Sequence, residues 1–190
     1  GSGKSFFLAQ RYLLRLLAGG HNILAVRKVA RTNRDSTFAL FRQVIAQWKL
    51  NDYFSVRESD CRIRCTLNGS SVIFAGLDDV EKLKSITFEN GVLTDIWIEE
   101  ASEVEEGDFN QLDVRLRGGT GQKQICLSFN PISANHWLKR RFFDRRDEKA
   151  MVLHTTYRDN AFLDEGYRSL LEGYRTSDPY YYDVYCLGQW

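Results

Sequence analysis

The first five residues, Gly1-Ser2-Gly3-Lys4-Ser5, have the types and order that bind a polyphosphate. They match the end of the phosphate-binding loop G-x-x-x-x-G-K-[ST], whose first glycine would precede residue 1, so we expect the chain to begin inside this motif. The glycines let backbone N–H groups surround the phosphates, Lys4 adds a positive charge, and the Ser5 hydroxyl binds Mg²⁺. All five are therefore candidate ATP-binding residues, with ATP and Mg²⁺ as cofactors. A flexible Gly-Ser segment with an incidental lysine is the alternative.

The residues that follow the loop favour phosphate binding. Residues 6–17 form a strongly apolar run, and Gly19-Gly20 closes it. A phosphate-binding loop requires a helix at this place, because the positive N-terminal end of the helix faces the anion. A flexible segment has no such requirement.

Two adjacent carboxylates are candidates for the metal ligand and the base that hydrolysis of a phosphate bond requires. Residues 96–98 read as a buried strand, and Glu99 and Glu100 follow it directly. Open α/β sheets bind ligands at the carboxyl ends of their strands. Because adjacent strand residues point to opposite faces, we assign Glu99 to the Mg²⁺ shell and Glu100 to activation of the attacking water. A solvated acidic loop is the alternative, since further acids occur at positions 103–108.

A third polar group, Ser128-Phe129-Asn130, ends the apolar strand predicted over residues 124–129. If this strand lies between the strand before the phosphate loop and the acidic strand, its polar side chains reach the γ-phosphate. Asn130 or Ser128 could then hydrogen-bond the phosphate or the water and sense its loss. Asn130-Pro131 is also a typical strand-ending turn, and both interpretations can hold.

Length and composition limit the remaining possibilities. A chain of 190 residues suits one α/β domain with a real core. The net charge of +1 excludes a global basic field, so any DNA contact must come from local patches. No apolar stretch approaches about 18 residues, and we expect no membrane partner. The four cysteines and three scattered histidines do not form a plausible zinc set.

The periodicity predicts an α/β fold. The phosphate loop and the glutamates at a strand end place it in the P-loop NTPase class, of the additional-strand, catalytic-glutamate type. Its mostly parallel central sheet is flanked by helices. Strands are predicted at 23–26, 61–67, 71–75, 93–98, 124–129 and 151–155. Helices are predicted at 6–17, up to 48 after a cap at Asp35 or Ser36, and at 80–86, 105–116, 135–143 and 165–175. Asn68-Gly69 joins two alternating strands into an antiparallel hairpin at the sheet edge.

Three motifs in this order resemble the large terminase subunit of tailed double-stranded DNA phages. They are G-S-G-K-S at residues 1–5, I-W-I-E-E-A-S-E at 96–103 and L-S-F-N-P at 127–131. Further stretches agree, and they lie at residues 27–28 (R-K), 34–36 (R-D-S), 81–86 (E-K-L-K-S-I), 157–160 (Y-R-D-N) and 187–190 (L-G-Q-W). The resemblance covers nearly the whole chain.

The resemblance implies that residues 1–190 are an ATPase motor domain, with about 160–190 as its C-terminal helical segment. Lys4 and Ser5 correspond to the Walker A pair, Glu99 and Glu100 to the Walker B pair, and residues 128–130 to the coupling motif. Glu99 departs from the aspartate that is usual at its position. The family's nuclease domain would follow residue 190, so no DNA cleavage is expected from this chain.

The same resemblance implies the partners and the setting. The motor would thread double-stranded DNA into a procapsid through the portal protein, in the host cytoplasm, together with the small terminase subunit. A homo-oligomeric ring is expected on the procapsid. The rival interpretations are another P-loop DNA motor, such as a helicase or recombinase, and a non-hydrolysing nucleotide-binding or DNA-docking module.

Basic residues supply two further sets of candidates. A ring-shaped ATPase often completes its site with a cation from the neighbouring subunit. The candidates for this cation are Lys84, Arg115 and Arg117. The candidates for DNA contact are Lys139, Arg140 and Arg141. Surface salt bridges are the alternative for the first set, and nearby acids interrupt the second.

Overall fold

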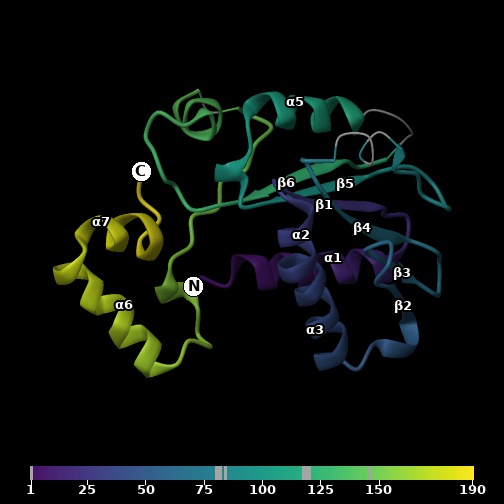
Figure 1. The fold of residues 1–190 in the computed structure, drawn as a ribbon, viewed down its shortest axis with the longest axis horizontal. Coiled ribbons are helices and arrows are strands. Elements are labelled where there is room, and N and C mark those ends of the chain that lie inside the picture. The colour runs from purple at the N-terminus through teal and green to yellow at the C-terminus, as the bar shows by residue number, and fades with distance from the viewer. Residues whose placement is uncertain (1, 80–82, 84, 117–120, 146) are drawn as a thin grey trace. The chain divides into compact units, whose positions relative to one another are not determined.

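The computed structural model describes residues 2–79, 83, 85–116, 121–145 and 147–190 (Figure 1). The chain divides into two compact units. The sheet unit is Ser5–Ser128, and the helical unit combines Gly1–Lys4 with Phe129–Trp190. Both boundaries fall inside predicted motifs, one within the phosphate loop and one within the coupling motif. The assignment of residues 1–190 to one motor domain stays a prediction.

In the described residues, the sheet unit contains one six-stranded sheet with the order β2-β3-β4-β1-β5-β6. The strands are β1 (Ile23–Arg27), β2 (Phe54–Arg57), β3 (Arg62–Cys65), β4 (Ser71–Gly76), β5 (Asp95–Glu99) and β6 (Gln124–Ser128). Strands β4, β1, β5 and β6 are parallel, and β2 and β3 are antiparallel. The mostly parallel α/β fold with an antiparallel edge is therefore confirmed.

The predicted hairpin is present as β3 and β4, but it does not form the edge by itself. Strand β4 pairs with β3 on one side and with β1 on the other, so it lies inside the sheet. All six residues of β4 are buried. The edge strand is β2, which the sequence did not separate from its surroundings because three of its four residues are exposed.

Helices cover the two faces of this sheet (Figure 1). On one face lie α1 (Lys4–Ala18), α2 (Ala30–Asn33) and α3 (Ala39–Gln47), and on the other lies α5 (Glu106–Arg115). The core between α1, α3 and β5 is aromatic. Trp97 stacks on Tyr12 at 5.9 Å and lies 6.1 Å from Phe41, measured between ring centroids. This packing holds the middle of α1 against the strand that ends in Glu99.

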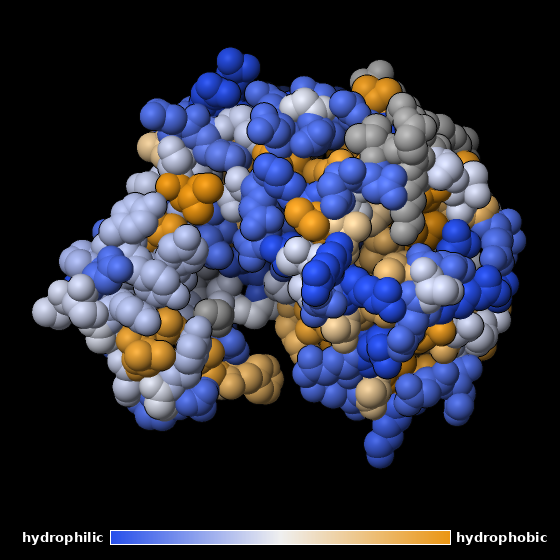
Figure 2. All heavy atoms as spheres, viewed as in Figure 1, coloured by the Kyte–Doolittle hydropathy of each residue, from blue (hydrophilic) through white to orange (hydrophobic). Residues whose placement is uncertain are grey.

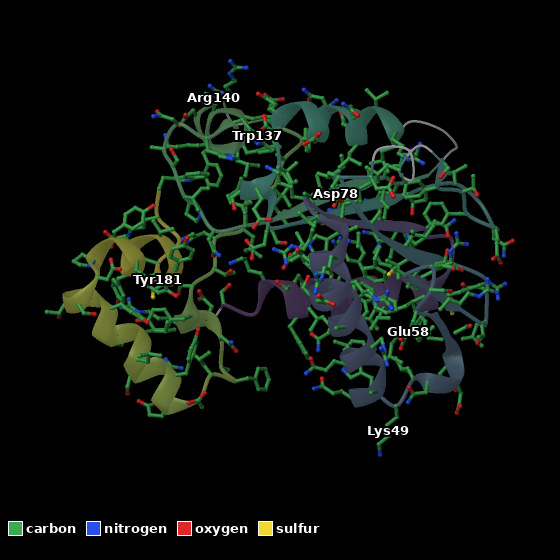
Figure 3. All side chains as sticks on the ribbon, viewed as in Figure 1. Lys49, Glu58, Asp78, Trp137, Arg140 and Tyr181 are labelled. Atoms are coloured by element: carbon green, nitrogen blue, oxygen red, sulfur yellow. The ribbon has the colours of Figure 1, made fainter. Side chains whose placement is uncertain are left out.

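The prediction that Asp35 or Ser36 caps a helix is wrong. The helical run begins earlier, at Ala30, and passes through a π-helical turn (Arg34–Phe38) into α3. The carboxylate of Asp78 accepts the Ala30 N–H at 2.9 Å, so a residue from beyond β4 binds the first turn (Figure 3). The cap was predicted from adjacent residues, whereas Asp78, which binds the first turn, is distant in the sequence.

Three other predicted elements differ from the structure. Residues 151–155 form no strand; Met151 and Leu153 there are 88% and 68% exposed. The basic helix begins at Trp137 and continues as a π-helical turn, Lys139–Asp144, rather than starting at residue 135. The piece predicted over residues 80–86 falls largely outside the described residues.

The helical unit is held by a small core of its own. Its elements are a 3₁₀ turn (Tyr157–Asp159), α6 (Glu165–Ser177), α7 (Pro179–Tyr181) and a π-helical turn (Tyr182–Cys186). The buried side chains of this core are Tyr157, Leu171, Tyr182 and Cys186. Asp164 caps α6 by accepting the Tyr167 N–H, which explains why the predicted helix begins at residue 165.

Apolar side chains also reach the surface of the helical unit. Phe162 is 97% exposed, and orange spheres lie on the part of the surface that carries α6 and α7 (Figure 2). Within the described ranges, no helix is both long enough and apolar enough to cross a bilayer.

Candidate active site

Glu99, the last residue of β5, is a buried carboxylate bound by two hydroxyl groups of the sheet unit. Ser5, in the first turn of α1, donates to Glu99 Oε1 at 2.5 Å. Ser128, the last residue of β6, donates to Glu99 Oε2. Glu99 is only 8% exposed, so these donors satisfy a carboxylate that would otherwise be costly to bury. The structure thus places the predicted Mg²⁺ ligands, Ser5 and Glu99, in direct contact.

Strand register explains why Ser128 reaches Glu99. Strands β5 and β6 pair in parallel with Glu99 opposite Ser128, and residues in register point to the same face. The same register puts Trp97 near Ser128, and the indole Nε1 donates to Ser128 Oγ at 2.8 Å. The position of Glu99 is therefore linked through Ser128 to the aromatic core.

Glu100 leaves the strand immediately. Its backbone is left-handed, with φ 51° and ψ 51°, a conformation that is uncommon for a residue with a side chain. It precedes a 3₁₀ turn, Ala101–Glu103, in which the Glu103 N–H donates to the Glu100 carbonyl at 2.9 Å. The chain therefore turns between the two glutamates, and the different roles assigned to them stay a prediction.

Arg27 is a neighbouring residue that the sequence analysis did not assign to the site. It ends β1, which lies beside β5, and its side chain is largely buried. Nη1 donates to Ser36 Oγ at 3.2 Å, and Nη2 lies 3.7 Å from Glu103 Oε2. Arg27 thus joins the turn after Glu100 to the π-helical turn. An arginine directly after an apolar strand was the available signal.

A cavity of about 350 Å³ adjoins Ser5 and Glu99 in the sheet unit. The π-helical turn forms another wall, through Asp35, Ser36 and Thr37. The volume is within the range of small-molecule sites. Asp35 and Ser36, predicted as helix caps, therefore line this cavity instead.

The other part of the predicted site lies in the helical unit. Lys4 Nζ donates to Asn130 Oδ1 at 3.1 Å and to Ser2 Oγ at 3.4 Å. Gly3 has a φ of +80°, which favours glycine at this point of the loop. The predicted phosphate-binding lysine and the predicted sensing asparagine are therefore in contact.

The Phe129 ring packs against other aromatic side chains, unlike Ser128, which contacts Glu99, and Asn130, which contacts Lys4. Its ring contacts Phe143 at 6.5 Å and Trp190 at 5.9 Å, and those two rings lie 5.2 Å apart. The three consecutive residues of the coupling motif thus have three different surroundings: Ser128 contacts Glu99, Phe129 joins an aromatic cluster, and Asn130 contacts Lys4.

The remaining candidates are basic residues and the first glycine. Arg115 donates to the Ile86 carbonyl at 3.0 Å, and burial lowers the pKa of its guanidinium. Lys139 pairs with Asp144 at 2.9 Å, while Arg140 is exposed and points away from the ribbon (Figure 3). Three predicted site residues lie outside the described residues, and they are Gly1, Lys84 and Arg117.

The oxygen donors beside the cavity suit Mg²⁺. Mg²⁺ prefers hard oxygen ligands and is usually held by one or two protein groups together with substrate phosphates. Ser5 and Glu99 supply a hydroxyl and a carboxylate in contact. A hydroxyl and a carboxylate are a donor set that fits a cation shared with a polyphosphate.

The parallel sheet, the helix that starts at the G-S-G-K-S loop and the serine–glutamate contact at a strand end define an α/β protein of the P-loop class. A sequence model of one family, described as phage terminase large subunit, matches residues 1–189. The chain belongs to this family, and the resemblance inferred from the ordered motifs is confirmed.

Individual relatives agree with this assignment. The chain is 34% identical over 203 residues to the PBSX phage terminase large subunit of Bacillus subtilis (strain 168), covering 97% of this chain and 46% of the relative. The large terminase subunit of Bacillus phage SPP1 is 28% identical over 174 residues, covering 88% and 41%. The chain thus spans less than half the length of these relatives.

The fold also matches a solved structure. The large terminase of a thermophilic bacteriophage, solved in complex with ATP-gamma-S, has a TM-score of 0.77 and 21% identity to this chain. The match covers 100% of this chain and 45% of that chain. At this identity the likeness shows a common fold.

Proposed function

We propose that this chain is the ATP-hydrolysing motor part of a phage terminase large subunit. The observation that carries the proposal is the contact of Ser5, which ends the phosphate loop, with Glu99, which ends a buried strand. A serine and an acid held together at this edge of a parallel sheet are the protein ligands that a Mg²⁺–nucleotide complex requires. The ATP-gamma-S complex of the thermophilic phage terminase supports the choice of nucleotide.

Each predicted residue has a role in this proposal. Lys4 neutralises the β- and γ-phosphates, and Ser5 and Glu99 would hold Mg²⁺. When bound, Mg²⁺ would offset the negative charge that develops on the phosphates during transfer. Glu100 orients and deprotonates the attacking water from the turn after β5. Asn130 senses the γ-phosphate through its contact with Lys4.

The wider setting is proposed from the family. Hydrolysis would drive double-stranded DNA through a portal into a procapsid in the host cytoplasm. The small terminase subunit and a ring of copies of this chain would assist, with a cation from a neighbouring copy at each site. Among the candidates for that cation, Arg115 is the one that the structure describes. The exposed Arg140 is the strongest of the three candidates for DNA contact.

The proposal is tested by ATP hydrolysis, with and without duplex DNA, by the chain extended upstream of Gly1 so that the loop motif is complete. Lys4→Ala should abolish both binding and turnover. Glu100→Gln should lower turnover at least about 100-fold and leave ATP binding intact, because only the base is lost. Glu105→Gln is the matched control, since Glu105 is exposed and directly precedes α5, and it should hydrolyse normally.

Two outcomes would contradict the proposal. Ordinary turnover by Glu100→Gln would remove the assigned base. Nucleotide binding without any hydrolysis by the unsubstituted protein would favour a binding module instead of a motor.

A further inference from the structure

The Y-R-D-N motif at residues 157–160 has no part in the function proposed above, yet its last residue lies beside the phosphate loop. A Cβ atom built on Gly3 would be 3.9 Å from both Cγ and Nδ2 of Asn160. Both residues belong to the helical unit. Figure 1 shows the amino-terminal end of the chain next to the segment that leads into α6. A polar side chain far along the sequence therefore flanks the loop.

The orientation of the Asn160 amide follows from its other contact. Oδ1 accepts the N–H of Phe162 at 3.1 Å, so this oxygen closes a local turn. Nδ2, in contrast, is on the side of Gly3. An amide nitrogen only donates hydrogen bonds, and phosphate oxygens only accept them. Asn160 thus presents a neutral donor to the loop that holds the polyphosphate.

A network of hydrogen bonds fixes the turn that carries Asn160. Thr156 and Asp159 form a capping box, in which the Thr156 N–H donates to Asp159 Oδ2 at 2.6 Å. Tyr157 is only 1% exposed, and its hydroxyl group donates a hydrogen bond to the Glu172 carboxylate of α6. Arg158 donates to the hydroxyl groups of Tyr157 at 3.2 Å and Tyr182 at 3.0 Å. The donor is therefore preorganised before any ligand arrives.

We propose that Asn160 is a nucleotide-binding residue that holds the phosphate loop and donates from its side-chain amide to the phosphates of a nucleoside di- or triphosphate. The proposal rests on the function proposed above and adds a hydrogen-bond donor beside Gly3 of the phosphate loop, within the helical unit. The network behind this turn connects the occupied loop to α6. Closing the local turn uses Oδ1, and the proposed binding role uses Nδ2.

Asn160→Asp separates these two roles. Aspartate keeps the size of the side chain and the oxygen that accepts the Phe162 N–H, but it replaces the donor with a negative charge beside the phosphates. We expect the dissociation constant of a fluorescent ATP analogue to rise at least about tenfold at low salt, because like charges a few ångströms apart repel strongly. Raising the ionic strength should reduce the difference. Asn160→Ala adds no charge, although it removes both the donor and the oxygen that accepts the Phe162 N–H, and it should weaken binding less.

Asn135→Asp is the matched control, because it makes the same exchange at an exposed position of the helical unit and should bind the analogue normally. Circular dichroism checks that each variant is folded. If folded Asn160→Asp binds the analogue as tightly as the unsubstituted protein, the binding role is wrong and the proposed function still stands. If the unsubstituted protein with a complete loop binds no nucleotide, the proposed function fails and Asn160 loses its role with it.

Discussion

Glu99 shows how single side chains organise the candidate site. Its two oxygens accept from different hydroxyl groups, one at the start of a helix and one at the end of a neighbouring strand. A bound cation would compete for the Ser5 oxygen, whereas Ser128 can keep the carboxylate oriented. Glu99 is longer than the aspartate that is usual at its position. The contact with Ser128 restricts this extra length, so the substitution is compatible with a metal role.

Arg27 leads to a prediction at the same scale. Its guanidinium contacts Ser36 and Glu103, so it supports the turn that directly follows Glu100. Arg27→Ala should lower ATP turnover about tenfold and change the dissociation constant of ATP less than twofold, because Glu100, the proposed base, loses its support while the loop is unaltered. Single-turnover hydrolysis and equilibrium binding measure the two quantities.

Arg42→Ala is the control for this prediction. Arg42 pairs with Glu58 at 2.7 Å, with both side chains about half exposed, and Figure 3 shows Glu58. Such surface pairs contribute about 0–1 kcal/mol, so turnover should stay normal. Arg27→Lys should recover part of the lost turnover, since it restores the charge. An equal loss of binding and turnover in Arg27→Ala would argue for a general folding defect instead.

At the scale of elements, the aromatic cluster of Phe129, Phe143 and Trp190 connects the predicted coupling motif with the basic turn. Phe143 belongs to the π-helical turn Lys139–Asp144, which also carries the candidate DNA-contacting residues. A change at Asn130 therefore has a packed route, through the adjacent Phe129, to the basic turn. Packed side chains transmit displacement because protein interiors have low compressibility.

Phe143→Leu tests this connection. It keeps an apolar side chain but removes the edge-on ring contacts with Phe129 and Trp190. We expect basal ATP hydrolysis to remain within about twofold of normal while stimulation by duplex DNA is largely lost. Phe162→Leu is the control, because it makes the same exchange at a side chain of the helical unit that is 97% exposed, and it should not affect stimulation. Equal stimulation in both variants would contradict a coupling role for the cluster.

For the whole molecule, two buried tyrosines predict the response to alkaline pH. Burial raises the pKa of Tyr12 in the sheet unit well above its usual value, and burial with a hydrogen bond to Glu172 raises the pKa of Tyr157 to about 12 in the helical unit. Both folded-state pKa values exceed the unfolded value of about 10. Their stabilising contribution is therefore complete below pH 10 and is lost as the pH rises through the folded-state pKa values.

The measurement is urea unfolding followed by circular dichroism between pH 9 and pH 12. The midpoint should fall as the pH rises above 10. Tyr157→Phe cannot ionise, so its midpoint should fall less steeply, although it starts lower because the hydrogen bond to Glu172 is missing. Parallel curves for the two proteins would show that Tyr157 does not titrate differently on unfolding.

The sequence by itself determined the class of fold and the family, and it proposed the residues of the candidate site. The G-S-G-K-S loop, the buried strand before Glu99 and the strand before Ser128 are recognisable because loop binding and strand burial depend on neighbouring residues. The helical signal after the loop was equally local. Reliance on neighbouring residues also explains the errors. The cap predicted at Asp35 or Ser36 was a local signal. The strand predicted over residues 151–155 had no partner strand in the described residues.

Only the tertiary structure decided which of these residues meet. The Ser5–Glu99 contact joins positions 94 residues apart, and the Ser128–Glu99 contact depends on strand register. Asp78 caps a helix that starts 48 residues earlier, and Asn160 lies beside Gly3. These pairings follow from how the sheet orders its strands and how the 157–160 turn is anchored. Residue types and spacing along one chain cannot specify such contacts, because each depends on the packing of segments that are distant in sequence.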